Sequence, residues 1–221
     1  MTRVRVKICC MATPAEAQMA ARAGADLVGL VGPMPTGAGI VTPETCRQIA
    51  DASAAWITPV LLTSSDTARG IADDVRAANV RAVQLVRHVD PGVHADLARD
   101  LPGVRRFQVI HVEDRAALDP IDTYDGLADA FLLDSGRPSQ AELGGTGRTH
   151  DWQVSADFVR ASPVPVFLAG GLHPGNVADA IEKVRPFGID VCSGLRTDDK
   201  LDQAKLTAFM AEIDRASRGI Q

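Results

Sequence analysis

Eight short apolar runs, separated by longer amphipathic stretches, constrain the fold of this chain more than any other feature. Each run is rich in Val, Ile, Leu or Phe, as strands buried on both faces of a parallel sheet are. The runs occupy residues 4–9, 26–32, 56–63, 81–86, 105–112, 128–135, 163–171 and 188–194. We therefore expect eight buried parallel strands.

The stretches between and after these runs have the character of helices. Several open with Pro or Asp near the first turn, as helix starts do. They cover residues 14–25, 43–54, 66–78, 90–101, 151–162, 174–186 and 201–217, with a weaker stretch at 115–128. Eight strand-then-helix units in 221 residues predict an α/β fold, a (β/α)8 TIM barrel that forms a single domain over residues 1–221. The alternative is a doubly wound sheet, which often has G-x-G-x-x-G after its first strand; this chain reads CCMATP there.

Composition excludes several classes of function. A net charge of −5 without any basic run argues against nucleic-acid binding. The N-terminus has no apolar signal-peptide core, and no apolar stretch approaches the roughly 18 residues of a membrane span. Four cysteines in a chain of this length do not make a disulfide framework, so we expect a reduced, cytoplasmic protein. The scattered histidines and the absence of C-x-x-C disfavour a metal site, and His94 is expected to be a solvated helix residue.

In a barrel of this kind the active site lies at the C-terminal ends of the strands, so the residues that close each run are the candidates. Cys9 shares strand parity with Arg5 and Lys7, which places it inside the barrel, whereas Cys10 should point away. Either cysteine could be buried packing or a reactive thiol; Cys46 and Cys192 are expected to be structural. Asp134 closes the run AFLLD, either as a helix cap or salt-bridge partner or as a general acid.

Three glycine-containing turns follow the last strands. They contain Gly144 to Gly147, Gly170-Gly171 and Ser193-Gly194. Glycines let the backbone approach a ligand closely, and turns of this kind beside a helix N-terminus form the usual phosphate site of barrels. Together they indicate a phosphorylated ligand.

Several motifs, in order and over nearly the whole chain, resemble the phosphoribosylanthranilate isomerase family. They are KIC at 7–9, AGADLVGLV at 23–31, AVQL at 82–85, FLLDS at 131–135, GGTGRTHDW at 144–152, LAGGLHPGNV at 168–177 and DVCSG at 190–194. The resemblance implies a barrel isomerase that carries out an Amadori rearrangement in tryptophan biosynthesis, without metal or organic cofactor. Its partner would be a phosphorylated small molecule, and the protein a monomer or homodimer.

The resemblance also implies roles for individual residues. Cys9 matches the general base and Asp134 the general acid, and Cys10 would support Cys9. The phosphate would be held by Gly145, Thr146, Gly147, Gly170, Gly171, Ser193 and Gly194. We also expect Lys7, Gln84 and Arg196 to contact the substrate.

The chain departs from the family pattern at five positions. Cys10 replaces a glycine, Val86 a histidine, His150 a phenylalanine and Arg196 an acid. Gly39 stands where the family has the arginine that contacts the anthranilate carboxylate, and Arg196, Arg87, Arg5 or His88 could supply another cation. Two alternatives follow from these departures: an isomerase for another phosphorylated aldose or glycosylamine, or a phosphosugar-binding barrel that does not catalyse.

Overall fold

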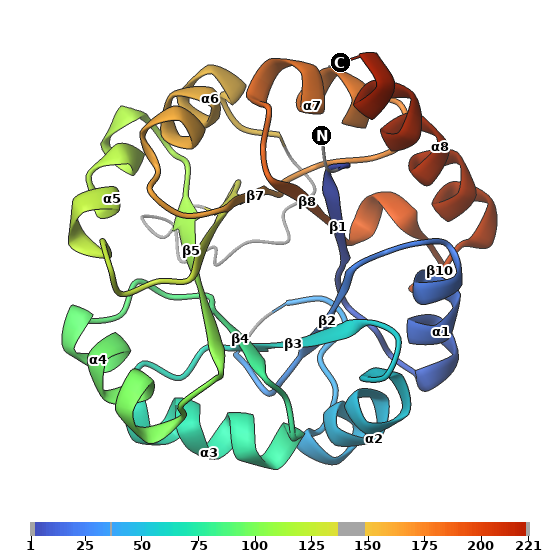
Figure 1. Ribbon diagram of the computed structural model, residues 1–221. Coiled ribbons are helices and arrows are strands. Elements are labelled where there is room, and N and C mark those ends of the chain that lie inside the picture. The colour runs from blue at the N-terminus through green and yellow to red at the C-terminus, as the bar shows by residue number, and fades with distance from the viewer. Residues whose placement is uncertain (1–2, 36, 137–148, 220–221) are drawn as a thin grey trace.

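The chain folds into a closed barrel of eight parallel strands with helices packed around its outside (Figure 1). The computed structural model describes residues 3–35, 37–136 and 149–219. Strand order around the barrel follows the chain, and β8 closes the circle by pairing with β1 from Arg5–Gly188 to Ile8–Val191. The predicted (β/α)8 fold is confirmed.

All eight predicted strands form within the expected apolar runs. They are β1 (Arg5–Ile8), β2 (Leu27–Val31), β3 (Thr58–Thr63), β4 (Ala82–Leu85), β5 (Arg105–His111), β6 (Ala130–Asp134), β7 (Val166–Leu168) and β8 (Gly188–Val191). Several of them, including β2, β4, β7 and β8, are buried along their whole length.

The predicted helices also form, with starts set by capping side chains. Thr13, Thr42 and Thr67 each accept a hydrogen bond from a backbone N–H of the first turn that follows. The helices are α1 (Pro14–Arg22), α2 (Pro43–Ser53), α3 (Ala68–Ala78), α4 (Pro91–Asp100), α6 (Trp152–Ala161), α7 (Val177–Val184) and α8 (Gln203–Gly219).

The weaker stretch at 115–128 forms less helix than predicted. It holds a 3-10 turn, η1 (Arg115–Leu118), and the single-turn helix α5 (Pro120–Thr123). Between β8 and α8 the chain adds elements that the sequence did not predict, the 3-10 turn η3 (Ser193–Leu195) and the small hairpin β9 (Arg196–Thr197) with β10 (Lys200–Leu201).

Alternate strand residues point into two separate cores. One set packs between the strands and the surrounding helices. The other fills the barrel itself and consists of Leu27, Val60, Ala82, Phe107, Val109, Ala130, Leu132, Phe167 and Ala169. In barrels of this kind the active site lies at the C-terminal mouth, above such a filled interior. In the described ranges no helix has the length and apolar character needed to cross a bilayer.

The prediction of a solvated His94 is wrong. Its side chain is fully buried, its Nε2 lies 3.0 Å from Gln108 Oε1, and its ring packs against Tyr124. Burial lowers the pKa of His94, although the Gln108 contact opposes this effect. The residue lies on the inner face of α4, which the mixed polar sequence of that helix does not reveal.

Candidate active site

An ion pair between Lys7 and Asp190 lies inside the barrel, below its C-terminal mouth. Lys7 Nζ is 2.9 Å from Asp190 Oδ1, and both side chains are buried. The two residues are register partners on β1 and β8. Burial alone would lower the pKa of Lys7, but the Asp190 carboxylate and Cys9 outweigh it and hold this pKa above its usual value. The ammonium therefore stays charged although its side chain is fully buried.

Cys9 lies beside Lys7, at the end of β1. Its side chain is buried, as the strand parity predicted, and it interacts with Lys7 through charge and a hydrogen bond. Gly29 on β2 leaves room for this pair, because a Cβ there would lie 2.6 Å from Cys9 Sγ and 3.1 Å from Lys7 Nζ. Burial raises the pKa of the Cys9 thiol to about 11, while Lys7 lowers it and Asp190 raises it further. The thiol is mostly protonated at neutral pH, and its thiolate, once formed, is a strong base.

Asp134 ends β6 and is half-buried. Its Oδ1 accepts a hydrogen bond of 2.7 Å from the backbone N–H of Ser135. Its charge acts on Asp190, so the carboxyl group lies within electrostatic reach of the ion pair. In the sheet Asp134 is the register partner of His111, the last residue of β5. The mouth of the barrel thus carries a thiol, a carboxyl group and an imidazole on β1, β6 and β5.

Alternation predicted that the side chain of Cys10 points away from the barrel, and this prediction is wrong. The Cys10 φ of 66° is left-handed, which breaks the alternation, and its side chain joins Cys9, Val31, Leu62 and Val86 in one buried cluster. Cys10 also forms a disulfide with Cys192 across the ends of β1 and β8, with 6.0 Å between the two Cα atoms. The expectation of fully reduced cysteines is therefore wrong for this pair, whereas Cys9 and Cys46 are free.

Two of the three expected phosphate turns lie side by side. Gly170 and Gly171 both have left-handed φ, of 84° and 61°. A Cβ at Gly194 would collide with the carbonyl oxygen of Leu172, so the turn after β7 touches the turn after β8. Ser193 is exposed beside them. The third turn, with Gly145, Thr146 and Gly147, lies outside the described residues.

The other two predicted substrate contacts differ in their surroundings. Gln84 is buried on the interior parity of β4, and its Oε1 has no hydrogen-bond partner in the described part of the chain. Arg196 is instead engaged: its Nη2 is 3.1 Å from Glu16 Oε2 and donates to the carbonyl oxygen of Cys10. Glu16 of α1 thus holds the guanidinium against the carbonyl oxygen of Cys10, just after the end of β1.

Sequence reasoning missed Asp190 and His111 as members of this constellation. Asp190 interrupts the apolar run GIDV at an interior position, and this break in the pattern is a signal that could have identified it. His111 Nε2 lies 3.1 Å from the carbonyl oxygen of Val86, and burial lowers the pKa of the imidazole. A neutral ring at the mouth can donate or accept a hydrogen bond.

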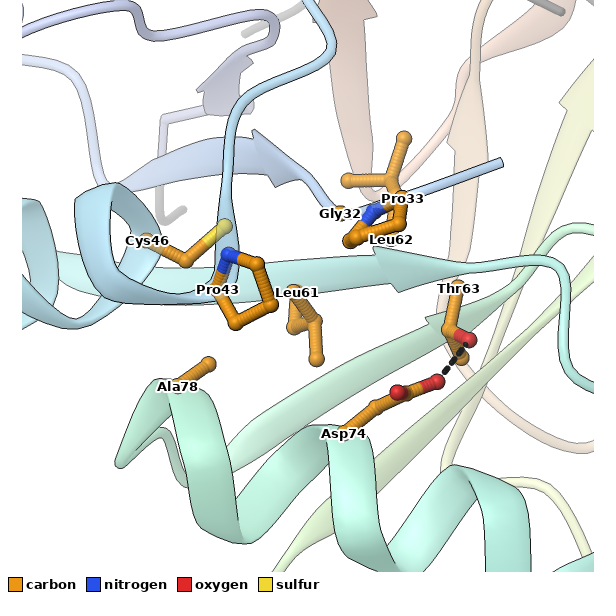
Figure 2. Close-up of a pocket in the computed structure, with 9 residues that line it drawn as sticks. All are labelled: Gly32, Pro33, Pro43, Cys46, Leu61, Leu62, Thr63, Asp74 and Ala78. Atoms are coloured by element: carbon orange, nitrogen blue, oxygen red, sulfur yellow. Dashed lines mark hydrogen bonds between the residues drawn. The ribbon is translucent and has the colours of Figure 1, made fainter. Parts of the chain in front are cut away.

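A small pocket on the outer side of β3 is separate from this mouth. Figure 2 shows it between α2, α3 and β3, with the Thr63 hydroxyl donating to Asp74 at 2.6 Å. Its free volume of about 10 Å³ holds one water at most. It is therefore too small for a sugar phosphate, and the candidate active site is the barrel mouth. The pocket is lined by Gly32, Pro33, Pro43, Cys46, Leu61, Leu62, Thr63, Asp74 and Ala78.

Comparison with known proteins points to one family. The model of the N-(5'-phosphoribosyl)anthranilate isomerase family matches residues 6–212. The N-(5'-phosphoribosyl)anthranilate isomerase of Methanocella arvoryzae is 35% identical, with 97% of this chain and 99% of that protein covered. The Halobacterium salinarum protein of the same name is 37% identical, with 94% of each chain covered.

Solved structures agree with these sequence relatives. The phosphoribosylanthranilate isomerase of Thermococcus kodakaraensis is 28% identical and superposes with a TM-score of 0.78, over 96% of this chain and 99% of that one. A phosphoribosylanthranilate isomerase in complex with reduced 1-(o-carboxyphenylamino)-1-deoxyribulose 5-phosphate is 25% identical, with a TM-score of 0.80 and the same two coverages.

We predict that Lys7→Met lowers the free energy of unfolding by about 3–5 kcal/mol, because it leaves the Asp190 carboxylate buried and unpaired. Urea denaturation at neutral pH measures this loss. The matched control is Arg47→Gln, which removes an exposed pair with Asp51 at 3.6 Å and should cost less than about 0.5 kcal/mol. Equal losses of unfolding free energy in the two variants would contradict the claim that Lys7 compensates the buried charge of Asp190.

Proposed function

The chain belongs to the N-(5'-phosphoribosyl)anthranilate isomerase family, and from this premise we propose that it catalyses the Amadori rearrangement of N-(5'-phosphoribosyl)anthranilate. The product would be the corresponding aminoketose, 1-(o-carboxyphenylamino)-1-deoxyribulose 5-phosphate, a step of tryptophan biosynthesis. The observation that carries this proposal is the thiol of Cys9 at the mouth that also holds the Asp134 carboxyl group. A biosynthetic enzyme of this kind would work in the cytoplasm, as a monomer or homodimer.

Each of these two groups has a task in the proposed reaction. Asp134, as general acid, protonates the furanose ring oxygen, and the sugar opens to a Schiff base. Cys9, as general base in its thiolate form, then takes up the proton from C2 and leaves an enolamine, which becomes the ketone when C1 gains a proton and the C2 hydroxyl loses one. Lys7 supports this step, because its charge lowers the proton affinity of the Cys9 thiol.

The two adjoining turns support binding of the phosphate. Their backbone can approach an anion closely, since Gly170, Gly171 and Gly194 carry no Cβ. We place the substrate phosphate against these turns and Ser193. Gly145, Thr146 and Gly147 would complete the site by resemblance to the family.

Position 39 is a glycine, so a cation from another position would have to bind the carboxylate of the anthranilate. Arg5 pairs with Asp26 at 2.7 Å at the opposite end of the barrel, and Arg196 is engaged by Glu16. His88 stacks on His111, with 5.8 Å between ring centroids. Arg87 follows the C-terminal end of β4, and its Nε has no hydrogen-bond partner in the described ranges. We therefore propose Arg87 as the carboxylate contact.

We expect the wild-type protein to convert freshly generated phosphoribosylanthranilate, which can be followed by the loss of its fluorescence. Cys9→Ala and Asp134→Asn should each lower kcat by about 10²–10⁴-fold, the usual contribution of a positioned base or acid. Thermal unfolding of both variants serves as the folding control. Absence of turnover in a folded wild-type protein would refute the proposed activity.

We further predict that Arg87→Met raises KM for this substrate while leaving kcat within a few-fold. Loss of a charge-assisted contact to a carboxylate costs about 2–5 kcal/mol, which corresponds to at least roughly 30-fold in binding. Arg5→Met, at the far end of β1, is the matched control with KM near that of the wild type. An unchanged KM in Arg87→Met would assign the carboxylate contact to another group.

A further inference from the structure

The disulfide between Cys10 and Cys192 joins the two halves of the candidate site. Cys10 directly follows Cys9, the proposed base, and Cys192 directly precedes Ser193, the start of a proposed phosphate turn. The bond spans 182 positions of sequence but only 6.0 Å between Cα atoms, because barrel closure brings β1 beside β8. One covalent link therefore fixes the base relative to the place of the phosphate.

The disulfide links β1 and β8 at the point where the backbone hydrogen bonds between these two strands end. The N–H of Cys9 still donates to the carbonyl oxygen of Val191 on β8, at 2.8 Å. Two residues later the N–H of Met11 donates to Gly29 on β2, at 3.0 Å. The chain changes its partner strand at Cys10, whose own φ of 66° is unfavourable for any residue with a Cβ.

The loop between β2 and α2 also rests on Cys10. A Cβ at Gly39 would lie 2.5 Å from the Cβ of Cys10 and 3.3 Å from its Sγ. Behind the strand, Arg196 donates to the carbonyl oxygen of Cys10. The left-handed turn at Cys10 thus lies against the disulfide, Gly39 of the loop and the Arg196 guanidinium, and it directly follows Cys9.

We propose that Cys10 and Cys192 are a redox-active pair that positions Cys9, and that the disulfide form is the catalytically competent one. This inference rests on the proposed function. Closing the bond removes one hydrogen from each thiol, and a small-molecule disulfide takes up the two protons and two electrons and splits into two thiols. Cys192 is partly exposed and Cys10 is buried, so we expect a small thiol to attack at Cys192 in the reverse reaction. In the reduced form nothing covalent holds the unfavourable conformation of Cys10.

The activity test compares wild-type protein equilibrated with glutathione disulfide and with reduced glutathione. Denatured samples should show two thiols in the first case, Cys9 and Cys46, and four in the second. We expect kcat to fall on the order of tenfold on reduction, since a displacement of about 1 Å can cost about 10²-fold. The kcat of Cys192→Ser should match that of the reduced wild type and should be the same with glutathione disulfide as with reduced glutathione. Four thiols under oxidising conditions, or equal kcat in both forms, would overturn the proposal.

A second measurement needs no turnover, so it remains decisive if the proposed function fails. It is the pH profile of Cys9 alkylation by iodoacetamide, located by mass spectrometry, in three proteins: the oxidised wild type, Cys10→Gly and Cys10→Ala. Both variants lack the disulfide, but glycine adopts left-handed φ freely and alanine does not. Cys9 faces Lys7 and Asp190, so a change in its direction alters its ionisation.

We expect the profile of Cys10→Gly to follow that of the oxidised wild type and the profile of Cys10→Ala to shift. Where turnover exists, kcat of Cys10→Gly should exceed that of Cys10→Ala about tenfold. Three identical profiles would show that Cys10 does not position Cys9, whatever the enzyme acts on.

Discussion

The ion pair between Lys7 and Asp190 is the interaction on which the rest of the site depends. Placing two charges inside an apolar barrel carries a large desolvation cost, which close pairing at 2.9 Å offsets only if both partners are present. The pair joins β1 to β8, where the barrel closes, and it sets the electrostatic environment of Cys9 directly above it. Folding and proposed chemistry are therefore coupled through the same two side chains.

Cys10 and Gly39 lie against each other in the structure. The side chain of Cys10 lies where a Cβ at position 39 would otherwise be, so a larger residue at 39 would collide with it. The side chain at the end of β1 therefore requires glycine at position 39 of the loop after β2.

Much of this architecture could be predicted from the sequence, because buried parallel strands leave apolar runs and alternation decides which residues enter the barrel. Alternation placed Lys7 and Cys9 inside correctly. It failed at Cys10, since a left-handed residue breaks the period of two. The disulfide could not be predicted, because its cysteines become neighbours only when the barrel closes. His94 was misassigned, since its partner Gln108 lies on a different element.

The central claim is that burial, partly offset by Lys7, keeps the Cys9 thiol protonated, so that its thiolate is a strong base. Its most direct test is an NMR titration of 13Cβ-labelled cysteine in oxidised Cys46→Ser protein, in which Cys9 is the one remaining thiol. We predict a titration midpoint near a pKa of about 11. A midpoint at or below the ordinary value of about 8.5 would contradict it, because the thiol would then ionise as though exposed to water or dominated by Lys7.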